Sequence, residues 1–249
     1  MTVSKNIALD PYISVDRKGQ TSFGGSQTWF PKDEKGHLRT LHEGGCGLIA
    51  AADFLLYYGR KEKTFVKAMP KAFIAAPDKP LSEEDYLALV NSLSKFSFPV
   101  IPKLGAFSFE ICLFMNRFFK KTGRDERLTY LIFNTKKRRT ELIRKQLEAG
   151  YPVPLCLGQH LFQPLSRQGV NFYVFKEGKP VIAVPGIYRH FVTITGIYLP
   201  DDASLPLYYE ISSWGQKYWI EAEELSRYMS RESAPWLSSV FILKSVKKG

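Results

Sequence analysis

GGCGLIAAADFLLYYG, residues 44–59, is the segment whose pattern decides how this chain folds. Its apolar residues recur at helical spacing, and Gly59 is a common kind of helix end. The pattern therefore predicts a buried helix over residues 46–58, with Cys46 in its first turn.

Cys46 differs from the other two cysteines in its surroundings. It stands between Gly45 and Gly47 at the predicted helix start, where the helix dipole stabilises a thiolate and small neighbours let another backbone approach. Cys112 and Cys156 lie in apolar runs typical of small buried hydrophobes. The wide spacing of all three predicts neither a disulfide framework nor a CxxC motif. Cys46 is a candidate nucleophile; the alternative is a capping turn with an incidental cysteine.

Helical patterns recur further along the chain. Ser82 followed by two glutamates is typical of a helix start, while Gly123 and Gly150 are typical of helix ends. We expect further helices at residues 82–94, 108–121, 135–149 and 221–229. The first 45 residues are rich in Gly, Lys and Asp and predict an extended arm or a short hairpin.

After Gly150 the apolar residues change from helical towards strand spacing. Short β-branched or aromatic runs are separated by Gly, Pro, Asp and Asn: YPVPLCLG, VNFYVF, KPVIAV, RHFVTITGIYL, LYYEISS, KYWIEA and SSVFILKSV. We therefore expect an α+β fold in one domain, residues 1–249. Its helical half covers about 40–150 and its mostly antiparallel sheet half about 151–249.

Composition narrows the class of protein. In 249 residues, 45% apolar content is enough for a sizeable core. The sequence has no apolar run long enough for a membrane span and no signal-peptide pattern at its start, so we expect a cytoplasmic protein.

The formal charge of +11 favours an anionic partner or surface but does not indicate which one. Eleven basic and three acidic residues lie between 117 and 145, with KKRR at 136–139. This run indicates either a nucleic-acid or targeting segment or a solvated helix face.

His190 is the candidate base because it opens the predicted strand HFVTITGIYL. A thiol needs a group that takes its proton and later returns one to the leaving group, and imidazole does both near neutral pH. His190 alone is more typical of a satisfied surface or core histidine. Its pairing with Cys46 is what predicts a function.

A metal site is the weaker interpretation of the same region. His37, His42 and Cys46 could supply ligands, but a glycine-rich stretch holds none of them rigidly and no second cluster of ligands follows. We expect His37 to be exposed and His42 to line a cleft, and His160 has no evident partner. No metal and no cofactor is therefore predicted.

Four pieces of sequence in a fixed order resemble one family. GGCGLIAAADFLLYYG, RKQLEAGYPVPL, RHFVTITGIY and YYEISSWGQKYWI, within residues 40–225, are similar to papain-like cysteine peptidases, particularly the bacterial C39-like branch. The resemblance implies a papain-like fold in which the helical half packs against the sheet half. It implies that Cys46 is the nucleophile, that His190 is the general base and later acid, and that the substrate is a peptide or amide.

The chain departs from that family at two positions. Papain-like enzymes carry Asn, and the C39-like branch Asp, where Ser212 precedes Ser-Trp-Gly in this chain. A serine can hold the imidazole tautomer but adds no charge, so Ser213 or Glu210 is an alternative partner. The family glutamine that donates to the oxyanion is absent just before Cys46. Gln27 is the nearest upstream candidate, and Gln159 is a weaker one.

Three functions follow from these patterns. The first is a cysteine peptidase or related thiol acyl-transfer enzyme, with catalytic residues Cys46, His190, Ser212 and Gln27. The second is a catalytically impaired papain-like scaffold that binds a peptide or an anionic partner. The third is a basic nucleic-acid-binding protein that acts through residues 117–145.

Overall fold

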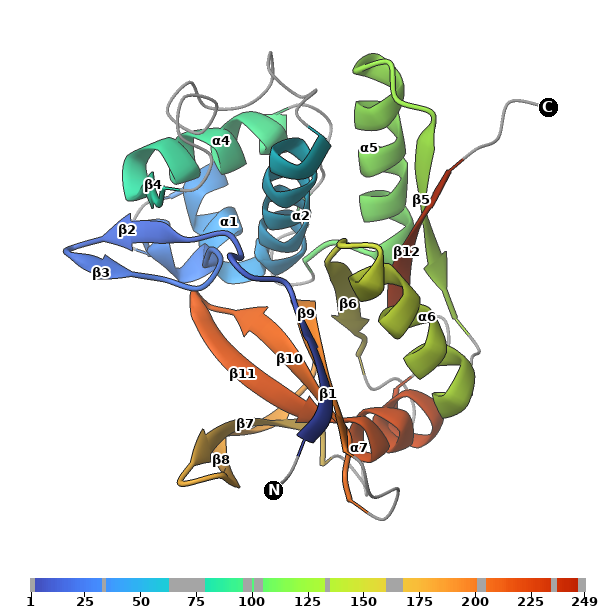
Figure 1. Cartoon of the computed structure of the whole chain (residues 1–249). Coiled ribbons are helices and arrows are strands. Elements are labelled where there is room, and N and C mark those ends of the chain that lie inside the picture. The colour runs from blue at the N-terminus through green and yellow to red at the C-terminus, as the bar shows by residue number, and fades with distance from the viewer. Residues whose placement is uncertain are drawn as a thin grey trace. The chain divides into compact units, whose positions relative to one another are not determined.

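The computed structural model describes residues 3–32, 35–62, 79–95, 100, 105–132, 135–159, 168–200, 205–233 and 237–245. These ranges form a mixed α+β protein with six α-helices and a large, mainly antiparallel sheet (Figure 1). The chain divides into two compact units. Unit 1 consists of residues 1–10, 130–212 and 217–242, and unit 2 of residues 11–129, 213–216 and 243–249.

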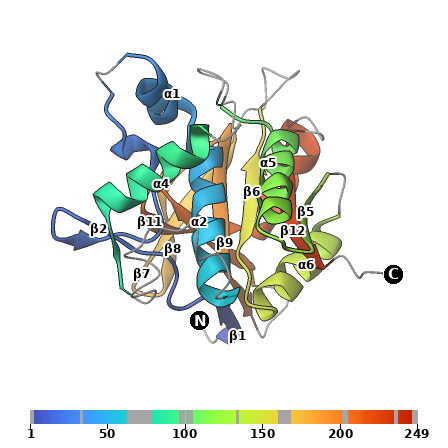
Figure 2. The ribbon, with the colours of Figure 1, turned by 90° about the horizontal axis from the view of Figure 1, so that it is seen from above.

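Unit 2 contains the helix predicted from the deciding segment. This helix, α2 (Cys46–Glu62), packs against α4 (Glu83–Lys95) and α5 (Ser108–Lys121), and Figure 2 shows it between the two. Most of α2 is buried because its apolar residues cover more than one face. A small sheet in the order β3-β2-β4 completes the unit, with β2 at Val15–Arg17, β3 at Gln20–Thr21 and β4 at Leu81–Ser82.

A short helix, α1 (His37–Gly44), precedes α2 with a single residue between them. That residue, Gly45, donates its N–H to the Leu41 carbonyl at 2.9 Å. A Cβ at Gly45 would lie 2.3 Å from the same carbonyl oxygen, so glycine is required for so close a junction. The prediction of only an extended arm or hairpin over the first 45 residues was therefore incomplete.

Unit 1 is built around the antiparallel strands predicted after Gly150. They are β6 (Val153–Leu157), β7 (Val170–Lys176), β8 (Lys179–Ile187), β9 (His190–Pro200), β10 (Tyr208–Ser213), β11 (Gln216–Glu221) and β12 (Ser239–Ser245). The strand order is β5-β12-β6-β9-β10-β11-β7-β8, with β5 at Glu126–Leu131. The first strand, β1 (Val3–Ala8), pairs with β9, a contact that local periodicity did not predict.

Two helices belong to unit 1. Helix α6 (Lys136–Glu148) contacts β1, β6 and β9, so the unit boundary lies before α6 and not near residue 150. Helix α7 (Ala222–Arg227) continues into a π-helical turn, Tyr228–Glu232. Within the described ranges of the chain, no helix has the length and apolar character that crossing a membrane requires.

Candidate active site

Cys46 is the first residue of α2, and its side chain is nearly buried, with 8% of the residue exposed. The first turn of a helix has backbone N–H groups without intrahelical acceptors, and these favour a negative charge at this position. Ile49 N–H already donates to the Gly45 carbonyl at 2.9 Å. The structure therefore has Cys46 in the first turn of a helix, where the sequence predicted it.

The other two thiols are held differently. Cys112 Sγ donates to the Leu128 carbonyl at 2.9 Å, and Cys156 Sγ donates to the Leu237 carbonyl at 3.2 Å. No cysteine forms a disulfide. Because a thiolate cannot donate, these two hydrogen bonds favour the protonated form, although Cys112 Sγ also accepts from Asn116 Nδ2 at 3.4 Å.

Gln27 begins a short 3-10 helix, η1 (Gln27–Trp29), in unit 2. Ser26 Oγ caps this turn by accepting from Thr28 N–H at 3.2 Å. After the turn, the carbonyl of Phe30 accepts a hydrogen bond from His42 Nδ1 at 2.6 Å. His42 of α1 therefore fixes the end of the segment that carries Gln27.

A buried carboxyl group in the middle of α2 was missed by the sequence analysis. Asp53 lies two turns after Cys46 and is 1% exposed. Its Oδ1 accepts from the Tyr86 hydroxyl at 2.7 Å, and its Oδ2 accepts from Gly25 N–H at 3.1 Å. Burial raises the pKa of Asp53 to about 7, although both hydrogen bonds act in the opposite direction. A single charged residue within an apolar helix was the sequence feature that could have identified it.

The Ser-Trp-Gly turn is joined to the same region of unit 2. Gly215 N–H donates to the Gly25 carbonyl at 2.9 Å, and Phe23 N–H donates to the Gly215 carbonyl at 2.9 Å. Trp29 lies edge-on to the Tyr86 ring, with centroids 5.7 Å apart. Hydrogen bonds therefore link α2, the Gln27 segment and the turn at residues 213–216 into one framework.

His190 is the first residue of β9 in unit 1 and is 6% exposed. It lies opposite Leu157 of β6, and its ring centroid is 6.4 Å from that of Phe172. Burial lowers the pKa of His190 to about 3, so the imidazole is neutral at physiological pH. A neutral imidazole has one nitrogen available as a proton acceptor.

Ser212 and Glu210 lie on β10, the strand next to β9. Ser212 is opposite Thr193, which is three residues after His190, so the two predicted residues of unit 1 are on adjacent strands. Glu210 is 2% exposed, and its carboxylate contacts Thr195 Oγ1 at 2.9 Å and Lys217 Nζ at 3.2 Å. Both oxygens of Glu210 thus have partners that stabilise its charge within the sheet.

The remaining candidates are spread over the molecule. His37 is exposed, as predicted, and its Nε2 is 2.7 Å from Ser94 Oγ. Gln159 is half-buried just after β6, and His160 lies outside the described residues. Among the described residues, no three His, Cys, Asp or Glu side chains are grouped as metal ligands.

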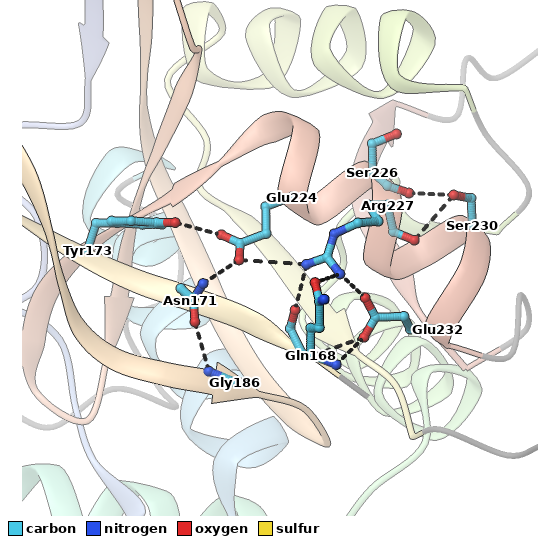
Figure 3. A network of polar contacts seen from close by, with 10 residues as sticks. Gln168, Asn171, Tyr173, Gly186, Glu224, Ser226, Arg227, Ser230 and Glu232 are labelled. Atoms are coloured by element: carbon cyan, nitrogen blue, oxygen red, sulfur yellow. Dashed lines mark hydrogen bonds and ion pairs between the residues drawn. The ribbon is translucent and has the colours of Figure 1, made fainter. Parts of the chain in front are cut away.

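Unit 1 also contains a dense polar network beside a cavity of about 530 Å³ (Figure 3). Glu224 accepts from Asn171 Nδ2 at 2.5 Å and from the Tyr173 hydroxyl at 3.1 Å. Arg227 donates to Gln168 Oε1 at 2.6 Å and also pairs with Glu232. These contacts join β7 to α7 and the π-helical turn. Holding these elements together is a structural role that accounts for the polar side chains of the network.

Cys46 and Gln27 are in unit 2, whereas His190 and Ser212 are in unit 1, so the proposed pairing of Cys46 with His190 stays a prediction. Comparison of the chain with models of protein families gives no match, and comparison with curated proteins gives none either.

Proposed function

We propose that this protein is a thiol acyl-transfer enzyme, such as a cysteine peptidase, which acts on a peptide or amide through Cys46 and His190. The observation that carries the proposal is the placement of Cys46 as the first residue of α2, next to glycines on both sides. Cys112 and Cys156 lie away from helix starts, and each donates a hydrogen bond to a backbone carbonyl.

The proposed reaction has two steps. His190 accepts the Cys46 proton, and the sulfur attacks the carbonyl carbon to give a tetrahedral oxyanion. Collapse of this intermediate forms a thioester and breaks the C–N bond, while the imidazolium returns the proton to the leaving amine. Water or an amine then attacks the thioester, with His190 again as base, and the thiol is restored.

The low pKa of His190 leaves its imidazole neutral but also makes it a weaker base. Neutral imidazole accepts a proton, but its buried site disfavours the imidazolium that results. The Cys46 thiolate would be the anion that stabilises this cation, so proton transfer would produce an ion pair. In the proposal Ser212 orients His190, while Glu210 keeps its structural contacts with Thr195 and Lys217.

Two donors are proposed for the oxyanion. One is the backbone N–H of Cys46 at the start of α2, and the other is the side-chain amide of Gln27. Support for Gln27 comes from the hydrogen bonds that fix its segment to α2 and α1.

The test is the reaction of the protein with p-nitrophenyl acetate. We expect a burst of p-nitrophenol and an acetyl group on the Cys46 peptide that neutral hydroxylamine removes, as it does from a thioester. Cys46→Ala should abolish the burst, whereas Cys112→Ala and Cys156→Ala should keep it. A burst of unchanged size in Cys46→Ala would contradict the proposal.

The second candidate function is binding of an anionic partner at the start of α6. A cavity of about 1320 Å³ there is lined by leucines and by side chains of both charges, the basic Lys136, Lys137, Arg138 and Arg144 and the acidic Glu141, Glu221 and Glu223, and Lys136 pairs with Glu223. Binding of a single-stranded oligonucleotide that falls steeply with salt, is lost in Lys137→Glu and survives Cys46→Ala would favour this function.

A further inference from the structure

Asp53 is a buried acid that the proposed reaction does not use. It lies on the helix that begins with Cys46, and it is hydrogen-bonded to a residue two positions before Gln27. Its second partner, Tyr86 of α4, is fully buried. An apolar residue can fill a buried helix position at a lower free-energy cost than a carboxyl group. A buried carboxyl group with both oxygens hydrogen-bonded therefore needs a specific explanation.

The contact between the Gln27 segment and this carboxyl group is unusually close. A Cβ at Gly25 would lie 1.9 Å from the Tyr86 hydroxyl oxygen, so no larger residue fits while Tyr86 donates to Asp53. The carbonyl of Gly25 is also engaged, because it accepts from Gly215 N–H at 2.9 Å. The backbone at residue 25 is therefore fixed through both its donor and its acceptor.

We propose that Asp53 is a positioning residue, which holds the Gln27 segment in a fixed place relative to α2 by accepting hydrogen bonds from Gly25 N–H and the Tyr86 hydroxyl. This inference rests on the proposed function, because it takes Cys46 as nucleophile and Gln27 as oxyanion donor. Asp53 touches neither substrate nor sulfur; it acts through the backbone of Gly25. Its loss affects the step that needs the oxyanion donor and not the nucleophilicity of Cys46.

Two reactions of the same thiol separate these effects. Acylation by p-nitrophenyl acetate passes through an oxyanion, whereas alkylation by iodoacetamide displaces iodide directly and forms none. We expect Gln27→Ala, Asp53→Leu and Tyr86→Phe to slow acylation of Cys46 by about tenfold to a hundredfold while its alkylation rate stays within about twofold. Asp53→Asn should retain most of the acylation rate, because an amide can accept from Gly25 and donate to Tyr86.

Tyr58→Phe is the matched control. Tyr58 is also fully buried, but its hydroxyl accepts from Arg124 Nε at 2.9 Å and does not contact Asp53. Its loss should lower stability and leave both reactions of Cys46 unchanged. Circular dichroism and thermal unfolding identify any variant that fails to fold. If Asp53→Leu fails to fold, Tyr86→Phe, which is the mildest change, still tests the proposal.

The outcomes distinguish the two proposals. If Gln27→Ala slows acylation but Asp53→Leu and Tyr86→Phe do not, Asp53 does not position this segment and the proposed function stands. If Tyr58→Phe slows acylation as much as Tyr86→Phe, the effect is general destabilisation and the inference is wrong. If wild-type Cys46 is acylated no faster than free cysteine, the proposed function itself fails.

Discussion

Asp53 in unit 2 and His190 in unit 1 are both buried ionisable groups, but their surroundings differ. The carboxyl group of Asp53 accepts hydrogen bonds from two donors. His190 lies opposite Leu157 and beside the ring of Phe172. Burial favours the neutral form of both, so it raises the pKa of the acid and lowers that of the base. The comparison teaches that burial sets the protonation state of both groups, while the partners of Asp53 indicate which segment it holds.

The largest expected effect is the response of stability to acid. Between pH 6.5 and about 3, the unfolded chain binds a proton at His190 that the folded chain does not, so the free energy of unfolding falls as the pH falls. The loss reaches about 5 kcal/mol at most. Asp53 contributes in the opposite direction over the same range, so the His190 effect is measured as a difference: on acidification from pH 7 to pH 4, urea unfolding should show that wild type loses more stability, or gains less, than His190→Phe. Equal slopes would contradict burial of a neutral imidazole.

Asp53 predicts a slope of the opposite sign. Between about pH 4 and pH 7 the folded chain holds a proton on Asp53 that the unfolded chain has lost, so the free energy of unfolding falls as the pH rises. The cost is about 4 kcal/mol at most. Tyr86, which faces Asp53, has a pKa raised well above its ordinary value and stays neutral in this range. The Asp53 effect is likewise measured as a difference: as the pH rises from 4 to 7, urea unfolding should show that wild type loses more stability, or gains less, than Asp53→Asn, and equal slopes would contradict a raised pKa for Asp53.

The oxyanion donor gives the next effect. Gln27→Ala should lower the rate of Cys46 acylation by about a hundredfold, which is the usual cost of one oxyanion donor. Gln159 is the weaker candidate. If Gln27 is the donor, Gln159→Ala should change the acylation rate by less than about twofold. The reverse result, measured by p-nitrophenol release, would transfer the role to Gln159.

The smallest expected effect concerns the two buried tyrosines. Tyr86→Phe removes the hydrogen bond to Asp53, and Tyr58→Phe removes those to Arg124 and Glu126; each should lower the free energy of unfolding by about 1 to 2 kcal/mol. Chemical denaturation should show a larger loss for Tyr86→Phe at pH 8, where Asp53 is mostly ionised, than at about pH 5, where it is protonated. An equal loss at the two pH values would mean that the Tyr86 hydrogen bond adds nothing specific to the ionised carboxyl group.

Local periodicity explains which parts of the fold were predictable. Helix α2 and strand β9 were found because each has a continuous apolar pattern in its own residues. Helix α1 was missed because its eight residues, HLRTLHEG, contain few apolar side chains and lie among glycines. Pairing of β1 with β9 joins segments far apart in the sequence, which no local pattern indicates.

The candidate site shows the same limit. Cys46 and His190 became candidates because each was predicted to begin an element and Cys46 lies between glycines. Asp53 was missed because its partners, Gly25 and Tyr86, are 28 and 33 residues away. The partners of Glu210 likewise come from other strands, so its ion pair with Lys217 could not be predicted from the sequence.

The central claim is that His190 activates the thiol of Cys46, and the pH dependence of iodoacetamide labelling tests it most directly. Rates at Cys46, Cys112 and Cys156 are measured together by mass spectrometry between pH 5 and pH 10, in wild type and in His190→Ala. The account predicts that Cys46 is labelled well below pH 8, that this labelling is lost in His190→Ala, and that the other two cysteines are unchanged. Labelling of Cys46 that follows an ordinary thiol, with the same profile in both proteins, would contradict it.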